Sequence, residues 1–555
     1  MLRFVPRPLP AAAPLPGLAP WLSDLLIIRG IQTPEQAEAF LRPRLADLAD
    51  PFLLRDMDKI VSLLREAVRE GAPVLVWGDY DADGICAAAI MTETLREMGA
   101  NVSWRLPSRH AEGYGLNEAA LREMAGQYRY LVTVDCGVSN HAEAALARQL
   151  GMKVIITDHH ALPPELPEAD ALTNPLLDGY PCPHLCGAGV ALKICQALLG
   201  MAAAEKRLDL AAIATVADVV PLLGENRIIV REGLSRISSS SRPGLRALLR
   251  YAGVTPPLAA DHLAFRLGPR LNAAGRLESA DIAARLLLTE DPAEADALAQ
   301  KLEALNARRQ ALEKEITAAA DAQARAREDF AASRCLVVAG EGWNPGLIGL
   351  TAGRLCQRYH RPAVALSLDE DAATGSCRSI PGVNIFDMLG KCRNLLSRFG
   401  GHAQAAGLSL PRENINAFRA MLNQAVRESC DPACFEPAQE YDLALPFALW
   451  SPETLKTLSL LEPTGAGNPA PLFLLERAQV QSMRRVGKDL SHLQMTLLSG
   501  ESLLKGIAFS QGAAADQGYR DVDILYKPIL NEFRGKISVE AQVMALRPSN
   551  TAVCG

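Results

Sequence analysis

The sequence lacks three features that would place it in a common class of protein. Its best apolar run, 210–217, is far shorter than the roughly 18 residues that a membrane-spanning helix needs. It has no excess of positive charge, because 57 Lys and Arg against 63 Asp and Glu leave a net charge of −6. Its 12 cysteines are scattered rather than framed in pairs. A membrane span, a basic coat for gripping nucleic acid and a disulfide scaffold are therefore excluded.

These absences also bear on location. Prolines crowd residues 6–20 and break any hydrophobic segment of a secretory signal. We therefore expect reduced thiols, a cytoplasmic protein and no membrane partner. The tight cluster Cys182-Pro-His-Leu-Cys186 leaves half a zinc site open as an alternative, but no second Cys/His pair stands nearby at ligand spacing.

What is present is ordinary globular composition, with 49% hydrophobic and 22% charged residues in a chain of 555. That length suggests roughly three to four domains. Between residues 57 and 225, short apolar runs alternate with helical patterns, as at 74–77, 131–134 and 154–157. This alternation indicates βαβ units around a buried parallel sheet.

The rest of the chain divides into three further patterns. Residues 291–330 have one apolar seam, typical of a long helix that packs between domains; a coiled-coil dimer is the weaker alternative. A second α/β segment runs from 335 to about 430. The tail from about 440 to 549 has short strands and turn residues, which predict a small β-barrel or sandwich.

The most informative motif is Asp79-Tyr-Asp81-Ala-Asp83-Gly84, directly after the first apolar run. The letters match the start of a calcium loop, but Ile90 stands where that loop needs a bidentate Glu, and a strand precedes it instead of a helix. Three carboxylates within five residues repel one another, and cations make such a cluster stable.

Further candidate ligands follow the next strands. Asp135 ends the second strand, Asp158-His159-His160 closes the third, and Asp218 lies in an apolar stretch. Each Asp alone could be a helix cap, but carboxyl ends of parallel strands meet at one edge of the sheet. Carboxylates with imidazole favour Mn²⁺ or Mg²⁺, and this number of ligands could hold two ions for phosphoryl displacement.

In this order, the segments 79–84, 134–137, 158–160 and 217–220 resemble the four motifs of the DHH phosphoesterase superfamily. Further blocks are most similar to the RecJ family of single-strand-specific 5′→3′ DNA exonucleases: 107–116, 187–190, 269–277, 375–380, 399–408 and 462–469. The resemblance covers the chain from about residue 50 to 547.

The resemblance implies an α/β multidomain protein. Its expected parts are an N-terminal extension (1–50), a parallel-sheet DHH catalytic domain (51–289), a long connecting helix (290–330), an α/β DHH-associated domain (331–435) and a C-terminal OB-fold β-barrel (436–555).

The implied activity is metal-dependent removal of 5′-mononucleotides from the 5′ end of single-stranded DNA, in DNA recombination and repair. Implied partners are single-strand-binding protein and a helicase, and we expect a monomer. One alternative is a DHH phosphodiesterase acting on oligoribonucleotides or cyclic dinucleotides, which needs no OB-fold. Another is a catalytically silent DNA-binding scaffold, against which the intact acidic motifs count.

The resemblance also assigns roles to residues. Two Mn²⁺ or Mg²⁺ ions would be bound by Asp79, Asp81, Asp83, Asp135, His159 and Asp218. Catalysis would depend on Asp81, Asp83, Asp135, His159, His160 and Asp218, with His160 on the scissile phosphate and Asp158 orienting the histidines. The 5′ phosphate and nucleotide would be held by Arg109, Arg276, Ser376, Arg378 and His402. Guanidinium groups suit this role because they bind phosphate through two parallel hydrogen bonds. The alternative for each Arg is an ion pair on the protein surface.

Two residues depart from the family pattern. Trp77 stands where many DHH phosphoesterases have a metal-binding His, a role that Asp79 could take over. Asn344 stands where the family usually has His. In the expected barrel, cationic and aromatic side chains could track a DNA strand, or could form an ordinary solvated surface: Arg484, Arg485, Lys488, His492, Lys505, Tyr526, Lys527, Phe533 and Arg534.

Overall fold

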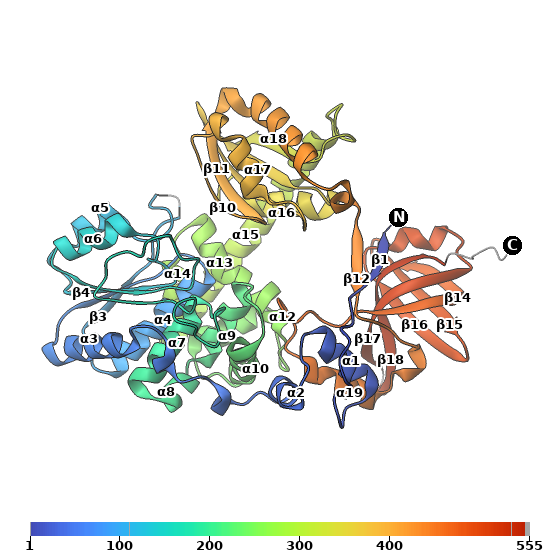
Figure 1. The fold of residues 1–555 in the computed structure, drawn as a ribbon, viewed down its shortest axis with the longest axis horizontal. Helices are drawn as coiled ribbons and strands as arrows, with labels where there is room; N and C mark the ends of the chain where they lie inside the picture. Colours follow the sequence, from blue (N-terminus) through green and yellow to red (C-terminus); the bar gives the residue numbers. More distant parts are fainter. Residues whose placement is uncertain (1, 110, 534, 550–555) are drawn as a thin grey trace. The chain divides into compact units, whose positions relative to one another are not determined.

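The computed structural model describes residues 2–109, 111–533 and 535–549 (Figure 1). The chain divides into two compact units. The larger comprises residues 48–436, and the smaller joins residues 1–47 to residues from 437 onward. Arg534 lies outside the described residues, as does the side chain of Phe533.

A parallel sheet forms the first part of the larger unit, in the order β3–β2–β4–β5–β6. The strands β2, β4 and β5, which hold the apolar runs, are buried on both faces, as these runs predict, while the edge strand β3 is partly exposed. Helices α5 and α6 cover one face, and α3, α4 and α7 pack on the other (Figure 1). The strands are β2 (Val74–Trp77), β3 (Val102–Arg105), β4 (Tyr130–Val134), β5 (Lys153–Thr157) and β6 (Ala171–Thr173). The helices are α3 (Met57–Glu70), α4 (Ala82–Glu97), α5 (Glu118–Glu123), α6 (His141–Gln149) and α7 (Gly187–Leu199).

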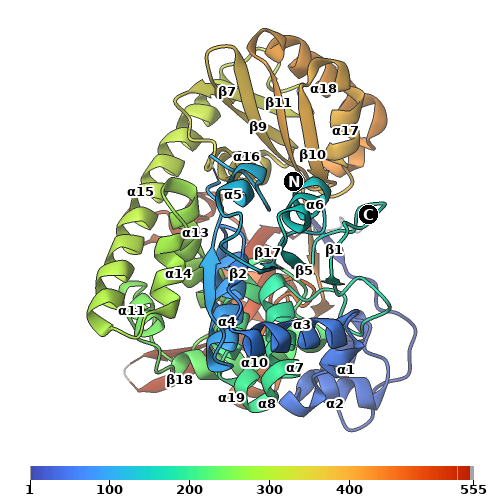
Figure 2. The ribbon, with the colours of Figure 1, turned by 90° about the vertical axis from the view of Figure 1, so that its left-hand side faces the viewer.

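A helical layer follows and ends in the long helix α15 (Pro292–Arg325). Asp291 caps it and Pro292 occupies its first turn, where the missing N–H costs nothing. The predicted apolar seam is confirmed, because Leu302, Leu305 and Ile316 are buried. Along this face α15 contacts α11, α13 and α14, then α16 (Ile348–Tyr359) and β7 (Leu336–Glu341) (Figure 2). Within the described ranges neither α15 nor any other helix is apolar enough to cross a membrane. The preceding helices are α8 (Met201–Glu205), α9 (Leu208–Ala217), α10 (Gly224–Ser238), α11 (Pro243–Tyr251), α12 (Ala260–His262), α13 (Gly268–Leu277) and α14 (Asp281–Leu288).

The second sheet of this unit has the order β10–β11–β9–β8–β7. Helices α17 and α18 supply the core on the face of Cys377 and Leu408. Side chains alternate along a strand, so Ser376 and Arg378 of β9 belong to the opposite face, where α16 packs. The elements are β7 (Leu336–Glu341), α16 (Ile348–Tyr359), β8 (Ala363–Leu368), β9 (Ala372–Arg378), α17 (Ile385–Lys391), β10 (Arg398–His402), β11 (Ala405–Pro411) and α18 (Ile415–Ser429).

The smaller unit is built on a closed barrel in which the order β14–β15–β16–β18–β17 returns to β14. The pairing of β16 with β18 is parallel and the others are antiparallel. This five-stranded closure confirms the expected OB-fold barrel. Its strands are β14 (Phe473–Val486), β15 (His492–Ser499), β16 (Ser502–Ala508), β17 (Asp521–Phe533) and β18 (Lys536–Pro548).

The N-terminal segment packs in the same unit as this barrel. Strand β1 (Arg3–Pro6) pairs in parallel with β12 (Ala438–Tyr441). Helices α1 (Pro20–Ile28) and α2 (Pro34–Leu41) join its core, and the Trp21 and Trp450 rings meet edge to face at 5.6 Å. The short β13 (Leu443–Ala444) and α19 (Pro452–Leu458) complete the unit. Residues 1–47 are therefore structurally continuous with the barrel core.

Candidate metal centre

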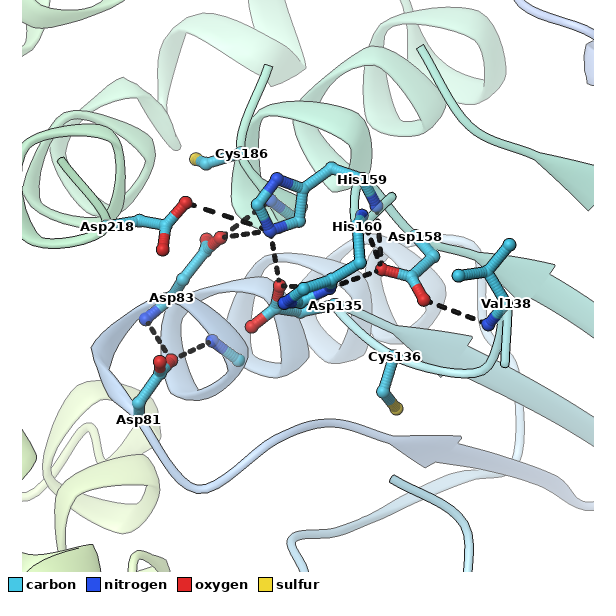
Figure 3. A network of polar contacts seen from close by, with 12 residues as sticks. Asp81, Asp83, Asp135, Cys136, Val138, Asp158, His159, His160, Cys186 and Asp218 are labelled. Atoms are coloured by element: carbon cyan, nitrogen blue, oxygen red, sulfur yellow. Dashed lines mark hydrogen bonds and ion pairs between the residues drawn. The ribbon is translucent and has the colours of Figure 1, made fainter. Parts of the chain in front are cut away.

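Acidic and imidazole groups meet at the carboxyl edge of the parallel sheet (Figure 3). Asp79 and Asp81 lie in the loop after β2, and Asp83 lies in the first turn of α4. Asp135 follows β4, the 158–160 segment follows β5, and Asp218 caps the end of α9. Their ligand atoms form three overlapping groups, each within 4.8 Å: Asp79, Asp81 and Asp135; Asp83, His159 and Asp218; Asp135, His159 and His160. The structure thus brings together all six residues that the sequence proposed as metal ligands.

Backbone N–H groups fix the first loop. The Asp81 carboxylate caps α4 by accepting from the N–H groups of Asp83 and Gly84 at 3.0 and 3.2 Å. The two oxygens of Asp83 accept from the first N–H groups of α7, at Gly187 and Ala188, both at 2.7 Å. A helix N-terminus attracts negative charge, so the first turn of α7 fixes the position of the Asp83 carboxylate.

Three buried atoms at the centre have no hydrogen-bond partner among the residues that the structure describes. They are Oδ1 of Asp79, Oδ1 of Asp135 and Nε2 of His159. The His159 Nε2 lies 3.0 Å from Asp135 Oδ1 and 3.7 Å from oxygens of Asp83 and Asp218. Buried polar atoms are rarely left unsatisfied, and oxygen and imidazole donors suit Mn²⁺ or Mg²⁺. The residues present therefore fit a divalent metal centre.

The electrostatics agree with this interpretation. Burial, and next the charge of Asp81, raises the pKa of Asp79 well above its usual range. Burial and repulsion from Asp83, then Asp81, do the same to the pKa of Asp135 and raise that of Asp218 to about 8. Burial lowers the pKa of His159, which keeps its imidazole neutral. A divalent cation bound among these carboxyls would favour their charged form and so relieve this repulsion.

His160 is hydrogen-bonded to Asp158, the carboxylate that we expect to orient the histidines. Asp158 Oδ1 lies 2.8 Å from His160 Nδ1 and also accepts from the backbone N–H groups of His159 and His160; Oδ2 accepts from Val138 at 2.9 Å. Burial opposes a charged imidazole, but the hydrogen bond and charge of Asp158 outweigh it and raise the pKa of His160 to about 9. The His160 side chain is 41% exposed, so its ring can face a substrate.

Sequence reasoning assigned no role to several groups that support the centre. The Tyr114 hydroxyl lies 3.0 Å from His160 Nδ1. Asn272 Oδ1 accepts from the N–H of Ala82 at 2.7 Å and so holds the first acidic loop. These residues fall in the blocks 107–116 and 269–277. The similarity of these blocks to the family was the sequence signal that could have pointed to them.

The proposed phosphate-binding residues cluster in the larger unit. Arg378 Nη1 donates to Ser376 Oγ at 3.2 Å, and a side chain on Gly349, in the first turn of α16, would crowd both groups. Burial, then repulsion from Arg109 and Arg309, lowers the pKa of Arg276 to about 10. A bound anion would relieve this repulsion between the guanidinium groups.

The remaining proposed residues lie at the margin of this cluster. The Arg109 guanidinium stacks 5.0 Å from the ring of Tyr80, next to the first acidic residue. His402 is exposed at the end of β10 and pairs in register with Ala405.

The two departures from the family pattern have structural roles. Trp77 is fully buried in the sheet core, and its Nε1 donates to the Gly115 carbonyl at 3.2 Å. Asn344 shapes the loop before α16 by accepting from Gly346 at 2.7 Å, and Arg276 donates to that residue's carbonyl at 2.8 Å.

Two other sequence candidates have ordinary structural roles. Cys186 caps α7, and Asn226 donates to the His184 carbonyl, so this segment is not among the described groups that could hold a metal. Tyr526 is fully buried with its hydroxyl accepting from Trp450 at 2.8 Å, so stacking on DNA by Tyr526 is corrected to a core role.

Family comparisons agree with the domain order. Residues 73–219 match the profile described as "DHH family, N-terminal domain", 330–428 match "DHHA1 domain" and 441–545 match "RecJ OB domain". The single-stranded-DNA-specific exonuclease RecJ of Salmonella typhimurium is 37% identical over 561 residues, which cover 95% of this chain and 96% of that protein. The chain belongs to the RecJ family. The Bacillus subtilis RecJ is 39% identical over 89% of this chain, which spans 63% of that longer relative.

A solved RecJ structure extends the likeness to three dimensions. The crystal structure of RecJ in complex with Mn²⁺ from Thermus thermophilus has a TM-score of 0.84 and 33% identity, over 98% of this chain and 79% of that one. A second RecJ structure from that organism is in complex with Mg²⁺. Relatives in the RecJ family thus bind the two ions for which the acidic cluster is suited.

Proposed function

We propose that this protein is a divalent-metal-dependent exonuclease that removes 5′-mononucleotides from the 5′ end of single-stranded DNA. The observation that carries the proposal is the set of three unpartnered buried atoms, on Asp79, Asp135 and His159, at the centre of the acidic cluster. Membership of the RecJ family supports the reaction class, and the arginine cluster supports recognition of a terminal phosphate.

Asp79, Asp81, Asp83, Asp135, His159 and Asp218 would hold two Mn²⁺ or Mg²⁺ ions. When bound, such ions supply an activated water and neutralise the charge that builds on the phosphate. The chain's own residues supply the orientation. Asp158 fixes the His160 ring through Nδ1, which leaves Nε2 to donate to an oxygen of the scissile phosphate.

The arginine cluster would select the 5′ end. A terminal phosphate carries more charge than an internal one and presents a fork of oxygens that guanidiniums grip bidentately. Arg109, Arg276, Ser376 and Arg378 would hold this group while the next phosphate lies at the metal centre, so each turnover releases one nucleotide. His402 would hold that nucleotide from β10.

The barrel would bind single-stranded DNA. Exposed cations on its strands, such as Arg484 and Lys505, give the sequence-tolerant backbone contacts that an exonuclease needs. We further propose a monomer in the bacterial cytoplasm that acts in recombination and repair, with single-strand-binding protein and a helicase as partners.

One experiment separates this function from its alternatives. The protein with Mn²⁺ is incubated with 5′-phosphorylated single-stranded DNA, the matching duplex, an oligoribonucleotide and a cyclic dinucleotide. Mononucleotide release from the single-stranded DNA alone supports the proposal. Release only from the RNA or the cyclic substrate favours a small-substrate phosphodiesterase, and DNA binding without release favours a silent scaffold. Either result overturns the proposal.

A further inference from the structure

We propose that Tyr114 is a positioning residue that holds His160 in its catalytic orientation through the phenol hydroxyl. The inference rests on the exonuclease function proposed above, in which His160 contacts the scissile phosphate. Tyr114 lies in the loop after β3, outside the acidic motifs, and is 43% exposed.

The contacts of Tyr114 join two strand ends of the centre. Its hydroxyl oxygen lies 3.0 Å from Nδ1 of His160 and 3.3 Å from the backbone carbonyl of Asp135. The tyrosine and imidazole rings also meet edge to face, with centroids 5.3 Å apart and planes at 65°. One side chain therefore contacts the histidine both through its ring and through its hydroxyl.

The direction of these hydrogen bonds follows from the chemistry of the acceptors. Asp158 Oδ1 lies 2.8 Å from the same Nδ1 atom. A carboxylate only accepts, so Nδ1 carries the hydrogen and shares it between Asp158 and the phenol oxygen. The phenol hydrogen is then donated to the Asp135 carbonyl, which also accepts only. Asp135 thus anchors Tyr114, and Tyr114 fixes the imidazole with Nε2 left for the substrate.

The local backbone keeps Tyr114 in place. It lies between Gly113 and Gly115, whose φ angles of 85° and 83° are the left-handed conformations that glycine tolerates. The Gly115 carbonyl accepts from Trp77 Nε1 at 3.2 Å, and a side chain on Gly115 would overlap Asn140. Trp77, a departure from the wider superfamily, therefore supports the loop that carries Tyr114.

The test is a double-mutant cycle with steady-state kinetics on 5′-phosphorylated single-stranded DNA. Tyr114→Phe removes only the hydroxyl, and we expect kcat to fall about fivefold to tenfold with KM unchanged within twofold. In a His160→Ala background the same substitution should lower kcat by less than twofold, because the group through which it acts is gone. Tyr128→Phe, in the loop before β4 and partly buried against the core of the sheet, is the matched control and should behave as wild type.

A second measurement does not depend on turnover. In the metal-free protein, Tyr114→Phe should move the ¹⁵N signal of His160 Nδ1 and leave that of His492, in the barrel, unchanged. An unchanged His160 signal, an unchanged kcat, or equal losses of kcat in both backgrounds would each overturn the inference. A rise in KM alone would make Tyr114 a substrate-binding residue and also overturn it. An inactive wild-type protein would instead refute the proposed exonuclease function.

Discussion

Nε2 of His159 lies 3.0 Å from Oδ1 of Asp135, yet neither atom has a hydrogen-bond partner among the described residues. Two buried polar atoms this close are normally bonded to each other. Here they are misaligned for a bond, and carboxylate oxygens of Asp83 and Asp218 lie 3.7 Å from the same nitrogen. The arrangement is that of ligands directed at a common ion.

Asp135→Asn keeps the shape of the side chain and removes its charge. We expect it to abolish DNA turnover and to weaken Mn²⁺ binding by at least about 100-fold, because even outer-sphere partners of metal ligands contribute up to that factor. Isothermal titration with Mn²⁺ measures the affinity, and circular dichroism checks the fold. Wild-type Mn²⁺ affinity in this variant would contradict the assigned ligand role.

Gly187→Ala should disrupt the same centre by steric overlap. A Cβ at Gly187 would collide with the Cβ and carboxylate of Asp135, so the carboxylate must move away from the cluster. We expect Mn²⁺ binding and turnover to be lost while α7 remains folded. Gly189→Ala, two residues along the same helix, is the matched control, because its Cβ meets only the flexible side chain of Leu185 and the thiol of Cys186. Equal effects of the two substitutions would count against this explanation.

The stability of the metal-free protein should depend on pH with a definite sign. Burial and neighbouring carboxylates raise the pKa of Asp218 from 3.8 to about 8. Between these values the folded state binds a proton that the unfolded state has lost, so stability falls as pH rises. A bound divalent ion favours the charged carboxylate and so removes this loss of stability at high pH. The Tm increase caused by Mn²⁺ should therefore be larger at pH 8 than at pH 5.5 in calorimetry.

Asp218→Asn is the control for this prediction, because it removes one titrating group. We expect the pH dependence of the metal-free Tm to become shallower in this variant. A Tm increase by Mn²⁺ that is independent of pH would contradict the prediction.

Much of this centre could be predicted from sequence because its groups follow strands of one parallel sheet. Topology alone brings Asp135 and His159 to the same edge once the apolar runs are recognised as strands. The supporting groups could not be found this way. Tyr114 lies in a loop whose path depends on Trp77 and Asn140, and loop paths are set by tertiary contacts that periodicity does not encode.

The packing of the N-terminal segment is a second example. Its prolines and mixed pattern indicated an extension, with no sign of where it would pack. In the structure β1 pairs with β12, more than 400 residues along the chain, and Trp21 joins the barrel core. Such a long-range pairing leaves no local signal. Tyr526 was similarly misjudged, since an aromatic in a strand looks the same whether its face is buried or exposed.

Arg378→Ala should weaken recognition of the 5′ phosphate more than the chemical step. The side chain is held by Ser376 and by the Cys377 carbonyl at 2.8 Å, which presets its guanidinium. The substitution removes a charged guanidinium that would donate two hydrogen bonds to the 5′ phosphate. We expect KM for 5′-phosphorylated DNA to rise about tenfold or more, with a smaller change in kcat. The effect is measured against the same strand with a 5′-hydroxyl end.

Two further variants make this test specific. Arg378→Lys keeps the charge without the fork and should have an intermediate KM. Arg354→Ala, on the exposed surface of α16, should leave both parameters unchanged. If Arg378→Ala raises KM equally for strands with a 5′ phosphate and with a 5′ hydroxyl, Arg378 contacts a part of the strand other than the 5′ phosphate.

Arg29→Ala should destabilise the smaller unit selectively. The Arg29 side chain is 3% exposed and donates to Asn468 Oδ1 and the Pro469 carbonyl, each at 3.0 Å, and it pairs with Asp442 at 3.4 Å. Its removal leaves the Asn468 and Pro469 oxygens without this donor, at a cost of about 1–3 kcal/mol for each buried acceptor left unsatisfied, while Asp442 keeps Arg7 as an ion-pair partner. We expect calorimetry of the full chain to show an earlier transition, with proteolysis beginning within residues 437–549. The control is Arg42→Ala, because Arg42 is an exposed residue that caps the C-terminal end of α2 and pairs with Glu38. Mn²⁺ binding should be retained in both variants, because every proposed ligand lies in the larger unit. Loss of Mn²⁺ binding in Arg29→Ala alone would contradict this and mean that the smaller unit contributes to the metal centre.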